Sequence, residues 1–86
     1  MSKVIVHRNA AKYHKRLPKN TKQLIKNILN QLQHNPLNLP GVKHMAGEWS
    51  GYHRLRSGKY RIIYWYDEKE DIVYVDSIGP RGDVYK

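Results

Sequence analysis

The chain opens with three β-branched residues at positions 4–6, which predict a short strand over residues 3–7. Asn9 is then a candidate N-cap for a first helix over residues 10–17. This helix should end before Pro18, because a residue that precedes proline is disfavoured in the helical conformation. The N-terminal segment therefore predicts a strand followed by a short helix.

A longer helical pattern follows, in which apolar residues recur at spacings of three and four. Thr21 is a candidate cap for this helix, and its end is expected near Asn35, because Pro36 comes next. The apolar face consists of Leu24, Ile25, Ile28, Leu29 and Leu32. We expect the two helices to form a hairpin with one shared apolar face and with their lysines on the solvent side.

The second half of the chain is rich in Tyr, Ile, Val and Trp, which favour strands. Prolines and glycines first mark an irregular connection over residues 36–51. Three strands are then predicted, separated by short turns, over residues 52–56, 60–66 and 72–78. The predicted fold class is α+β, with an N-terminal strand, a helical hairpin and a three-stranded antiparallel meander that forms one small sheet.

Side chains alternate between the two sides of a strand, and this alternation separates charged from apolar residues in the meander. A two-residue loop at Gly58 and Lys59 would place Arg56 opposite Arg61, with Arg54 on the same side. The opposite side then carries Leu55, Tyr60, Ile62 and Tyr64 as part of the core. Opposed arginines repel each other, which is tolerable mainly where a polyanion binds or where solvent is abundant. The pattern is thus open between an anion-binding face and a solvated basic face.

Charge narrows the choice of partner. The 86 residues carry a formal net charge of +9, which favours polyanions such as RNA, DNA, an acidic protein or a membrane surface. The positions up to Gly47 hold nine Lys or Arg residues and no acidic residue, whereas the remainder holds seven of each sign. The first half of the chain is therefore a cation, and the second half is balanced.

Length and cysteine content exclude several classes of protein. A chain of this size supports one small domain with a modest core, so an enzyme with a separate cofactor domain is excluded. The absence of cysteine excludes a disulfide framework, a thiolate metal site and a cysteine nucleophile. No apolar segment approaches the length of a signal-peptide core or a membrane span. We expect a cytoplasmic protein.

The histidines and the C-terminal residues are further candidates for chemistry. The five histidines show no recognised ligand spacing and no acidic residue precedes Glu48, so no metal or cofactor is expected. Arg81 follows a glycine–proline turn, and Tyr85 lies close behind it. An arginine and a phenol side by side suit phosphate and base contacts, although an ordinary C-terminal turn has the same composition.

One stretch of the sequence is similar to a known family. The residues GYHRLRSGKYRIIY at 51–64, followed by IGPR at 78–81 and VY at 84–85, resemble the RelE branch of the RelE/ParE toxin superfamily. The resemblance implies a RelE-like toxin domain over residues 1–86 of a type II toxin–antitoxin system. It further implies an mRNA endonuclease that cuts the codon in the ribosomal A site, inhibits translation and is held inactive by a cognate RelB-like antitoxin.

The resemblance also implies which residues perform the reaction. By position, the catalytic residues fall on Arg54, Arg61, Arg81 and Tyr85. Where such toxins carry a further basic residue upstream, this chain has Tyr52 and His53, which leaves the general base open. The expected substrate-binding residues are Tyr52, His53, Arg56 and Lys59, and the expected ribosomal RNA contacts are Lys12, Lys15, Lys19, Lys22 and Lys26. Among these residues, only His53 has a side chain whose ordinary pKa lies near neutral pH. Alternation, however, predicts that it points away from Arg54.

The proposed chemistry needs no metal, because the 2′-hydroxyl of RNA attacks the adjacent phosphate. Arginines suit the stabilisation of the extra phosphate charge, since they stay protonated and offer a planar fork of donors. Two other functions remain open: a ParE-like toxin that binds DNA gyrase, and a noncatalytic RNA-binding module. Ribosome, mRNA and antitoxin are the expected partners of the first function.

Overall fold

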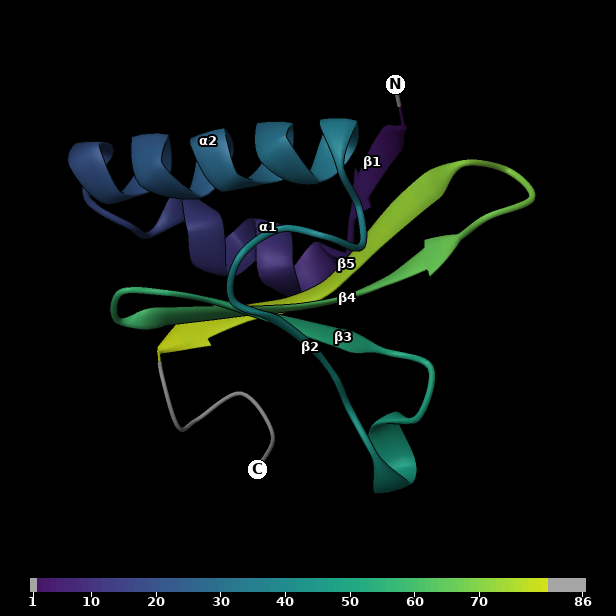
Figure 1. Ribbon diagram of the computed structural model, residues 1–86. Coiled ribbons are helices and arrows are strands. Elements are labelled where there is room, and N and C mark those ends of the chain that lie inside the picture. The colour runs from purple at the N-terminus through teal and green to yellow at the C-terminus, as the bar shows by residue number, and fades with distance from the viewer. Residues whose placement is uncertain (1, 81–86) are drawn as a thin grey trace.

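Five strands form one mixed sheet in the computed structural model, which describes residues 2–80. Two α-helices follow the first strand, and a single turn of 3-10 helix interrupts the later chain (Figure 1). The strand order is β1-β5-β4-β3-β2. The elements are β1 (Lys3–Val6), α1 (Arg8–Lys15), α2 (Lys19–His34), β2 (Val42–His44), η1 (Gly47–Trp49), β3 (His53–Ser57), β4 (Tyr60–Asp67) and β5 (Ile72–Pro80).

The predicted α+β class is confirmed, and the antiparallel meander is formed by β3, β4 and β5. The N-terminal strand joins the same sheet by pairing parallel to β5, with Val6 opposite Val75. This pairing brings the two ends of the described chain together in one ladder. Periodicity along the sequence predicts the strand but not this partner, because the contact joins segments about seventy residues apart.

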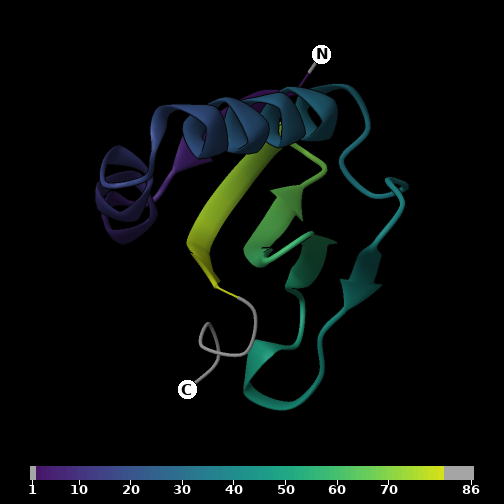
Figure 2. The same cartoon turned by 90° about the vertical axis from the view of Figure 1, so that its left-hand side faces the viewer.

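Both α-helices cover one face of the sheet, and within residues 2–80 no α-helix lies on the opposite face (Figures 1 and 2). The core lies between these two layers. Ile25 and Leu32 of α2 are fully buried against Ile62, Tyr64 and the valines of β5. Truncation of such a side chain to alanine costs about 2–5 kcal/mol of stability, so this layer dominates the energetics of the fold.

The ends of the helices differ from the sequence prediction. His7, rather than Asn9, caps α1, because the Nδ1 atom of His7 accepts a hydrogen bond from the backbone N–H of Asn9. The second helix starts at Lys19, so that Pro18, and not Thr21, occupies the N-cap position. Leu24 was expected on the apolar face but is 42% exposed, because it lies at the edge of the surface that packs on the sheet.

The connection that precedes the meander contains a strand that the sequence did not predict. β2 pairs antiparallel with β3, and the backbone N–H of Met45 donates to the carbonyl of Tyr52 where the two strands diverge. The connection is also fixed to the core, because the buried phenol of Tyr64 donates to the carbonyl of Pro36 at 2.6 Å. Burial raises the pKa of Tyr64 to about 12, so this phenol remains a donor at neutral pH.

The turn between β4 and β5 holds the start of the chain. The hydroxyl groups of Ser2 and Tyr66 both donate to the carboxylate of Asp71, which also has a left-handed backbone conformation with φ of 56°. These hydrogen bonds, that from Ser2 first, lower the pKa of Asp71. The N–H of Lys3 donates to the Asp71 carbonyl, so one residue anchors both β1 and the turn.

Candidate nucleic-acid interface

The open face of the sheet carries basic side chains from three neighbouring strands. Arg56 of β3 lies directly opposite Arg61 of β4, which is the predicted register. Arg54 is two residues earlier on the same side of β3, and it lies opposite Lys43 of β2. We call Lys43, Arg54, Arg56 and Arg61 the basic face; the three arginines are half-buried, and Lys43 is exposed.

Part of the floor of the basic face is apolar. Ile63 lies opposite Arg54 in the ladder and is fully buried, yet it projects to the side away from the helices. On the other side of β4, Gly79 lies opposite Arg61. A glycine there places no side chain beside the guanidinium group, so the surface of β5 next to Arg61 is low. An apolar floor lowers the local dielectric constant and strengthens the attraction between arginines and a bound anion.

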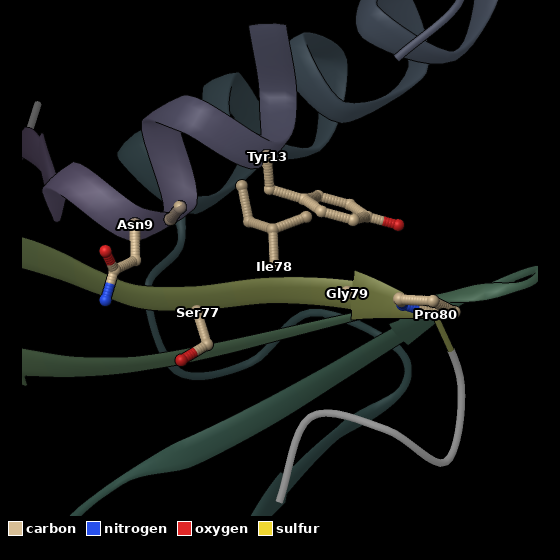
Figure 3. A pocket seen from close by; sticks show the side chains of 7 residues that line it. Asn9, Tyr13, Ser77, Ile78, Gly79 and Pro80 are labelled. Atoms are coloured by element: carbon tan, nitrogen blue, oxygen red, sulfur yellow. The ribbon is translucent and has the colours of Figure 1, made fainter. Parts of the chain in front are cut away.

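A bulge in β5 changes the register next to this face. Ile63 pairs with Ser77 and Tyr64 pairs with Val75, so Asp76 is one extra residue on β5. The hydroxyl of Ser77 donates to the carboxylate of Asp76 at 2.7 Å. Figure 3 shows the Ser77 side chain on the opposite side of β5 from α1. The bulge was not predicted, because alternation alone carries no signal for an inserted residue.

The C-terminal part of β5 runs beside α1, and a cavity of about 290 Å³ lies between them. Tyr13 and Ile78 fill the space between helix and strand, and the phenol of Tyr13 extends along β5 toward Pro80 (Figure 3). Two of the predicted catalytic residues, Arg81 and Tyr85, lie outside the described residues. The described part of β5 ends at Pro80, and Gly79, the residue before it, lies opposite Arg61 of β4.

His53, one of the expected substrate-binding residues, does not lie on the basic face, as alternation along β3 predicts. It points to the helix side of the sheet, where it is buried and stacked on Tyr64 with ring centroids 5.4 Å apart. His44 covers it from β2, with ring centroids 4.5 Å apart. Burial, and secondly the neighbouring His44, lower the pKa of His53. Alternation along β3 explains this placement, because His53 and Arg54 are adjacent residues.

The other expected contacts are distributed over the edges of the molecule. Lys59 is exposed in the β3–β4 turn, which Gly58 makes possible with φ of 55°. Tyr52 precedes β3 and packs edge-on against Trp49, with ring centroids 5.2 Å apart. The helix lysines lie on the layer that covers the opposite side of the sheet from the basic face (Figure 2). These are Lys12, Lys15, Lys19, Lys22 and Lys26, of which only Lys22 is half-buried.

Lys43 is a member of the basic face that sequence reasoning missed. Its strand is short and lies between Pro40, Gly41 and Gly47, so the segment was predicted to be irregular. The alternation of apolar Val42 with Lys43 was the available signal. Only the pairing of β2 with β3 places this lysine opposite Arg54.

Nearly the whole chain, including the basic first half and the meander, also matches a known family. Residues 4–85 match the family described as the ParE toxin of the type II toxin–antitoxin system, parDE. The chain belongs to the ParE toxin family. The structural neighbours extend this assignment to the wider RelE/ParE superfamily, as the sequence resemblance implies. No individually curated protein matches the sequence.

Several solved toxin structures have the same fold as this family member. The RelE–RelB complex from Pyrococcus horikoshii aligns with a TM-score of 0.82 at 25% identity, covering 95% of this chain and 97% of that chain. The toxin–antitoxin complex RelBE2 from Mycobacterium tuberculosis aligns at 0.81 and 22% identity, covering 93% and 98%. The isolated RelE toxin of E. coli aligns at 0.77 and 17% identity, covering 93% and 84%. The protein therefore has a RelE-like fold, and its family is one of type II toxins.

The described part of this toxin shows neither a cluster of metal-ligating side chains nor a helix that could span a membrane. Within residues 2–80, no three His, Asp or Glu side chains gather in a way that could hold a metal ion. None of the helices in that range is both long and apolar enough to span a membrane. The described part of the basic face carries permanently charged guanidinium groups, a residue type that suits the binding of anions.

Proposed function

We propose that this toxin is a ribosome-dependent endoribonuclease that cuts mRNA in the ribosomal A site. The reaction would take place in the cytoplasm. The observation that carries the proposal is the register of β3 and β4, which gathers Arg54, Arg56 and Arg61 on one open face. Three permanent charges on an apolar floor suit a phosphate that gains negative charge during the reaction. A lone arginine on a solvated surface would not have this property.

The reaction is an attack of the 2′-hydroxyl of one nucleotide on the adjacent phosphorus. The new bond joins the 2′-oxygen to phosphorus, and the bond from phosphorus to the 5′-oxygen of the next nucleotide breaks. A proton leaves the 2′-hydroxyl and another reaches the 5′-oxygen, so the products are a 2′,3′-cyclic phosphate and a 5′-hydroxyl. The protein must orient this attack in line and stabilise the charge on the phosphate.

The roles of Arg54 and Arg61 follow from their position on the basic face, and those of Arg81 and Tyr85 follow from the resemblance to RelE-type toxins. Arg61 contacts the scissile phosphate, and Arg54 positions the backbone or polarises the 2′-hydroxyl. Arg81 acts with Arg61, and Tyr85 orients the nucleotide. Tyr52, Arg56 and Lys59 bind the neighbouring nucleotides from the edges of the same face.

His53 is not included as a base, because its ring is buried on the helix side against Tyr64. The proposed site therefore holds few groups that transfer protons at neutral pH, and the RNA must be oriented by something other than the toxin. This requirement agrees with dependence on the ribosome. Free RNA, which is not held in line, is expected to be a poor substrate.

The helix lysines supply a second contact. Because they lie on the opposite layer from the basic face, they reach a different piece of RNA from the one that is cut. We assign them to the backbone of ribosomal RNA, which is bound through charge and not through sequence. The toxin would then sit between the decoding-site RNA and the mRNA.

A cognate antitoxin is the expected inhibitor. The structural neighbours from Pyrococcus horikoshii and Mycobacterium tuberculosis are complexes of a toxin with its antitoxin. For this chain, an antitoxin segment that is acidic and amphipathic would cover the basic face and exclude mRNA. Its charge complements the net charge of +9 on the toxin.

The test is cleavage on programmed ribosomes. Purified toxin is incubated with ribosomes that hold a defined codon in the A site, and cuts are mapped by primer extension. The expected result is a cut within that codon, with a 2′,3′-cyclic phosphate end, and little cleavage of the same mRNA without ribosomes. Intact mRNA under both conditions would refute the proposal.

The family match supports a second candidate. ParE-like toxins that bind DNA gyrase share this scaffold, and the matching family is described as ParE. A supercoiling assay with purified gyrase decides between the two functions. Inhibited supercoiling together with intact mRNA would select the gyrase function, whereas the reverse result would select the endoribonuclease.

A further inference from the structure

A cavity of about 480 Å³ lies where β2, η1 and the start of β3 meet, beside the basic face. Its wall includes Lys43, Met45, Glu48, Trp49 and Arg54. We propose that this cavity binds one unpaired nucleotide of RNA next to the scissile phosphate. The inference rests on the proposed endoribonuclease function and adds a subsite to it. Its volume falls within the range of about 300–1,000 Å³ that is typical of small-ligand pockets.

The cavity is continuous with the basic face, because Arg54 belongs to both. Lys43 lies opposite Arg54 in the β2–β3 ladder, and Arg61 lies on the next strand. The cations therefore follow one another across three strands that are spaced about 4.8 Å apart. A single RNA strand that crosses the sheet from Arg61 would place its next phosphate near Arg54 and Lys43. Its base would then be directed toward the cavity.

Trp49 supplies a surface on which a base can stack. Its ring is half-buried and contacts Tyr52 at an interplanar angle of 84°. This edge-on contact fixes the orientation of the indole. The second tryptophan differs, because Trp65 is stacked on Tyr74 with centroids 4.4 Å apart and an angle of 13°. One face of Trp65 is thus already covered, which makes it a matched control.

Glu48 gives the cavity a preference among bases. A carboxylate repels phosphate, so it directs the backbone toward Lys43 and Arg54. On the base itself, it can accept hydrogen bonds only from N–H groups. Adenine, cytosine and guanine each present an amino group on the Watson–Crick edge. Uracil presents two carbonyl oxygens around a single N–H, and both oxygens repel a carboxylate. The cavity should therefore disfavour uracil.

Tryptophan fluorescence tests the subsite without any cleavage. The Trp65→Phe variant reports Trp49 alone, and the Trp49→Phe variant reports Trp65 alone. Titration with hexa-adenylate should quench Trp49 strongly and Trp65 several times less. Equal quenching of both, or quenching of neither, would overturn the proposal. A thermal melt of each variant verifies that the chain is folded.

The role of Glu48 has its own measurement. The ratio of affinities for hexa-adenylate and hexa-uridylate is compared between the Trp65→Phe protein and the same protein with Glu48→Gln. Glutamine offers both a donor and an acceptor, so the ratio should fall by at least about threefold. An unchanged ratio would overturn the base preference.

The bound base belongs either to the mRNA or to ribosomal RNA, and cleavage kinetics separate these sources. Trp49→Ala should remove about tenfold in affinity, in line with the loss of one stacked base. A changed preference among codons assigns the base to mRNA, whereas an equal fall in kcat/KM over all codons assigns it to ribosomal RNA. If wild-type toxin cuts mRNA and Trp49→Ala changes neither quantity, the subsite is refuted. If wild-type toxin does not cut, the proposed function fails, and the fluorescence titration alone decides the subsite.

Discussion

Arg56 and Arg61 lie directly opposite each other across the β3–β4 hairpin, on the face of the sheet that points away from α1 and α2 (Figure 1). Opposed like charges on neighbouring strands destabilise a sheet, so this pair is unfavourable for folding alone. An anion held between the two side chains converts repulsion into attraction. Under the proposed function, a phosphate bound between the two side chains would supply that anion.

Removal of the Arg61 side chain should abolish most of the activity. Arg61→Ala is expected to lower cleavage on programmed ribosomes at least about a hundredfold, because an anion contact in the transition state is lost. The cleavage rate of Arg61→Lys should lie between those of the wild type and Arg61→Ala, since an ammonium group keeps the charge but not the planar fork of donors. Cleavage rates measured by primer extension check both values.

The matched control is Arg8→Ala, because Arg8 is exposed at the start of α1, on the opposite layer. This variant should retain activity within about threefold, as expected for an exposed side chain away from the basic face. A thermal melt of each variant verifies that it is folded at the assay temperature. Equal loss in both variants would mean that charge alone, and not the position of Arg61, determines cleavage.

The sequence was sufficient to predict the hairpin that carries this pair. A two-residue loop at Gly58 and Lys59 leaves one register, and alternation then divides Leu55 from Arg56. These are local constraints, which a single sequence contains. The roles of the arginines stay predictions, and Arg81 and Tyr85 lie beyond the described residues.

The parts of the site that were missed depend on distant contacts. β2 has only three residues and becomes a strand by pairing with β3, so neither Lys43 nor the cavity beside Trp49 could be placed from local pattern. The partner of β1 was not predicted for the same reason. Asp76 adds a residue to β5 without any turn or glycine signal, because its place is set by the pairing of β4.

The hydrogen bond from Tyr64 to the Pro36 carbonyl should contribute measurably to stability. Tyr64→Phe removes the donor and leaves a partly buried carbonyl without it, so the free energy of unfolding should fall by about 1–2 kcal/mol. Urea unfolding measures this change. Tyr74→Phe is the control, because Tyr74 packs on Trp65 through its ring, and it should change stability by less than about 0.5 kcal/mol.

The buried His53 should make the protein sensitive to mild acid. Its pKa is lowered in the folded state by burial and by His44, so the unfolded chain binds a proton more readily. The stabilisation is fully present above about pH 6.5, the unfolded value, and is lost as pH falls from there through the lower folded pKa. Denaturant unfolding at pH 7.5 and pH 5.0 should therefore show a less stable protein at the lower pH.

Two variants separate this titration from those of the carboxylates. His53→Phe preserves the stacking on Tyr64 but has no proton to gain, so the loss between pH 7.5 and 5.0 should shrink. His44→Gln removes the second cause of the lowered pKa and should shrink the loss by a smaller amount. The same acid sensitivity in wild type and in His53→Phe would exclude this histidine as the source.

Gly41 controls how closely the chain approaches the strand that carries the arginines. Its φ is +88°, and a Cβ atom there would lie 2.9 Å from the carbonyl oxygen of Arg56. Gly41→Ala should therefore combine backbone strain with a clash against backbone, at a cost of about 2 kcal/mol or more. Gly47→Ala is the matched control, because Gly47 has φ of +68° but no heavy atom within 4 Å of the added carbon. The control should show only the strain of about 1 kcal/mol.

The clash at Gly41 should also affect catalysis, because the N–H of Arg56 donates to the Gly41 carbonyl at 3.3 Å. Relief of the clash must move this part of β3 relative to Arg61, since the obstructing atom is backbone and cannot rotate away. Cleavage by Gly41→Ala should then fall severalfold, and by more than that of Gly47→Ala, at a temperature where both variants remain folded. Equal stability and equal rates in the two variants would show that the backbone beside Arg56 adapts without disturbing the arginine pair.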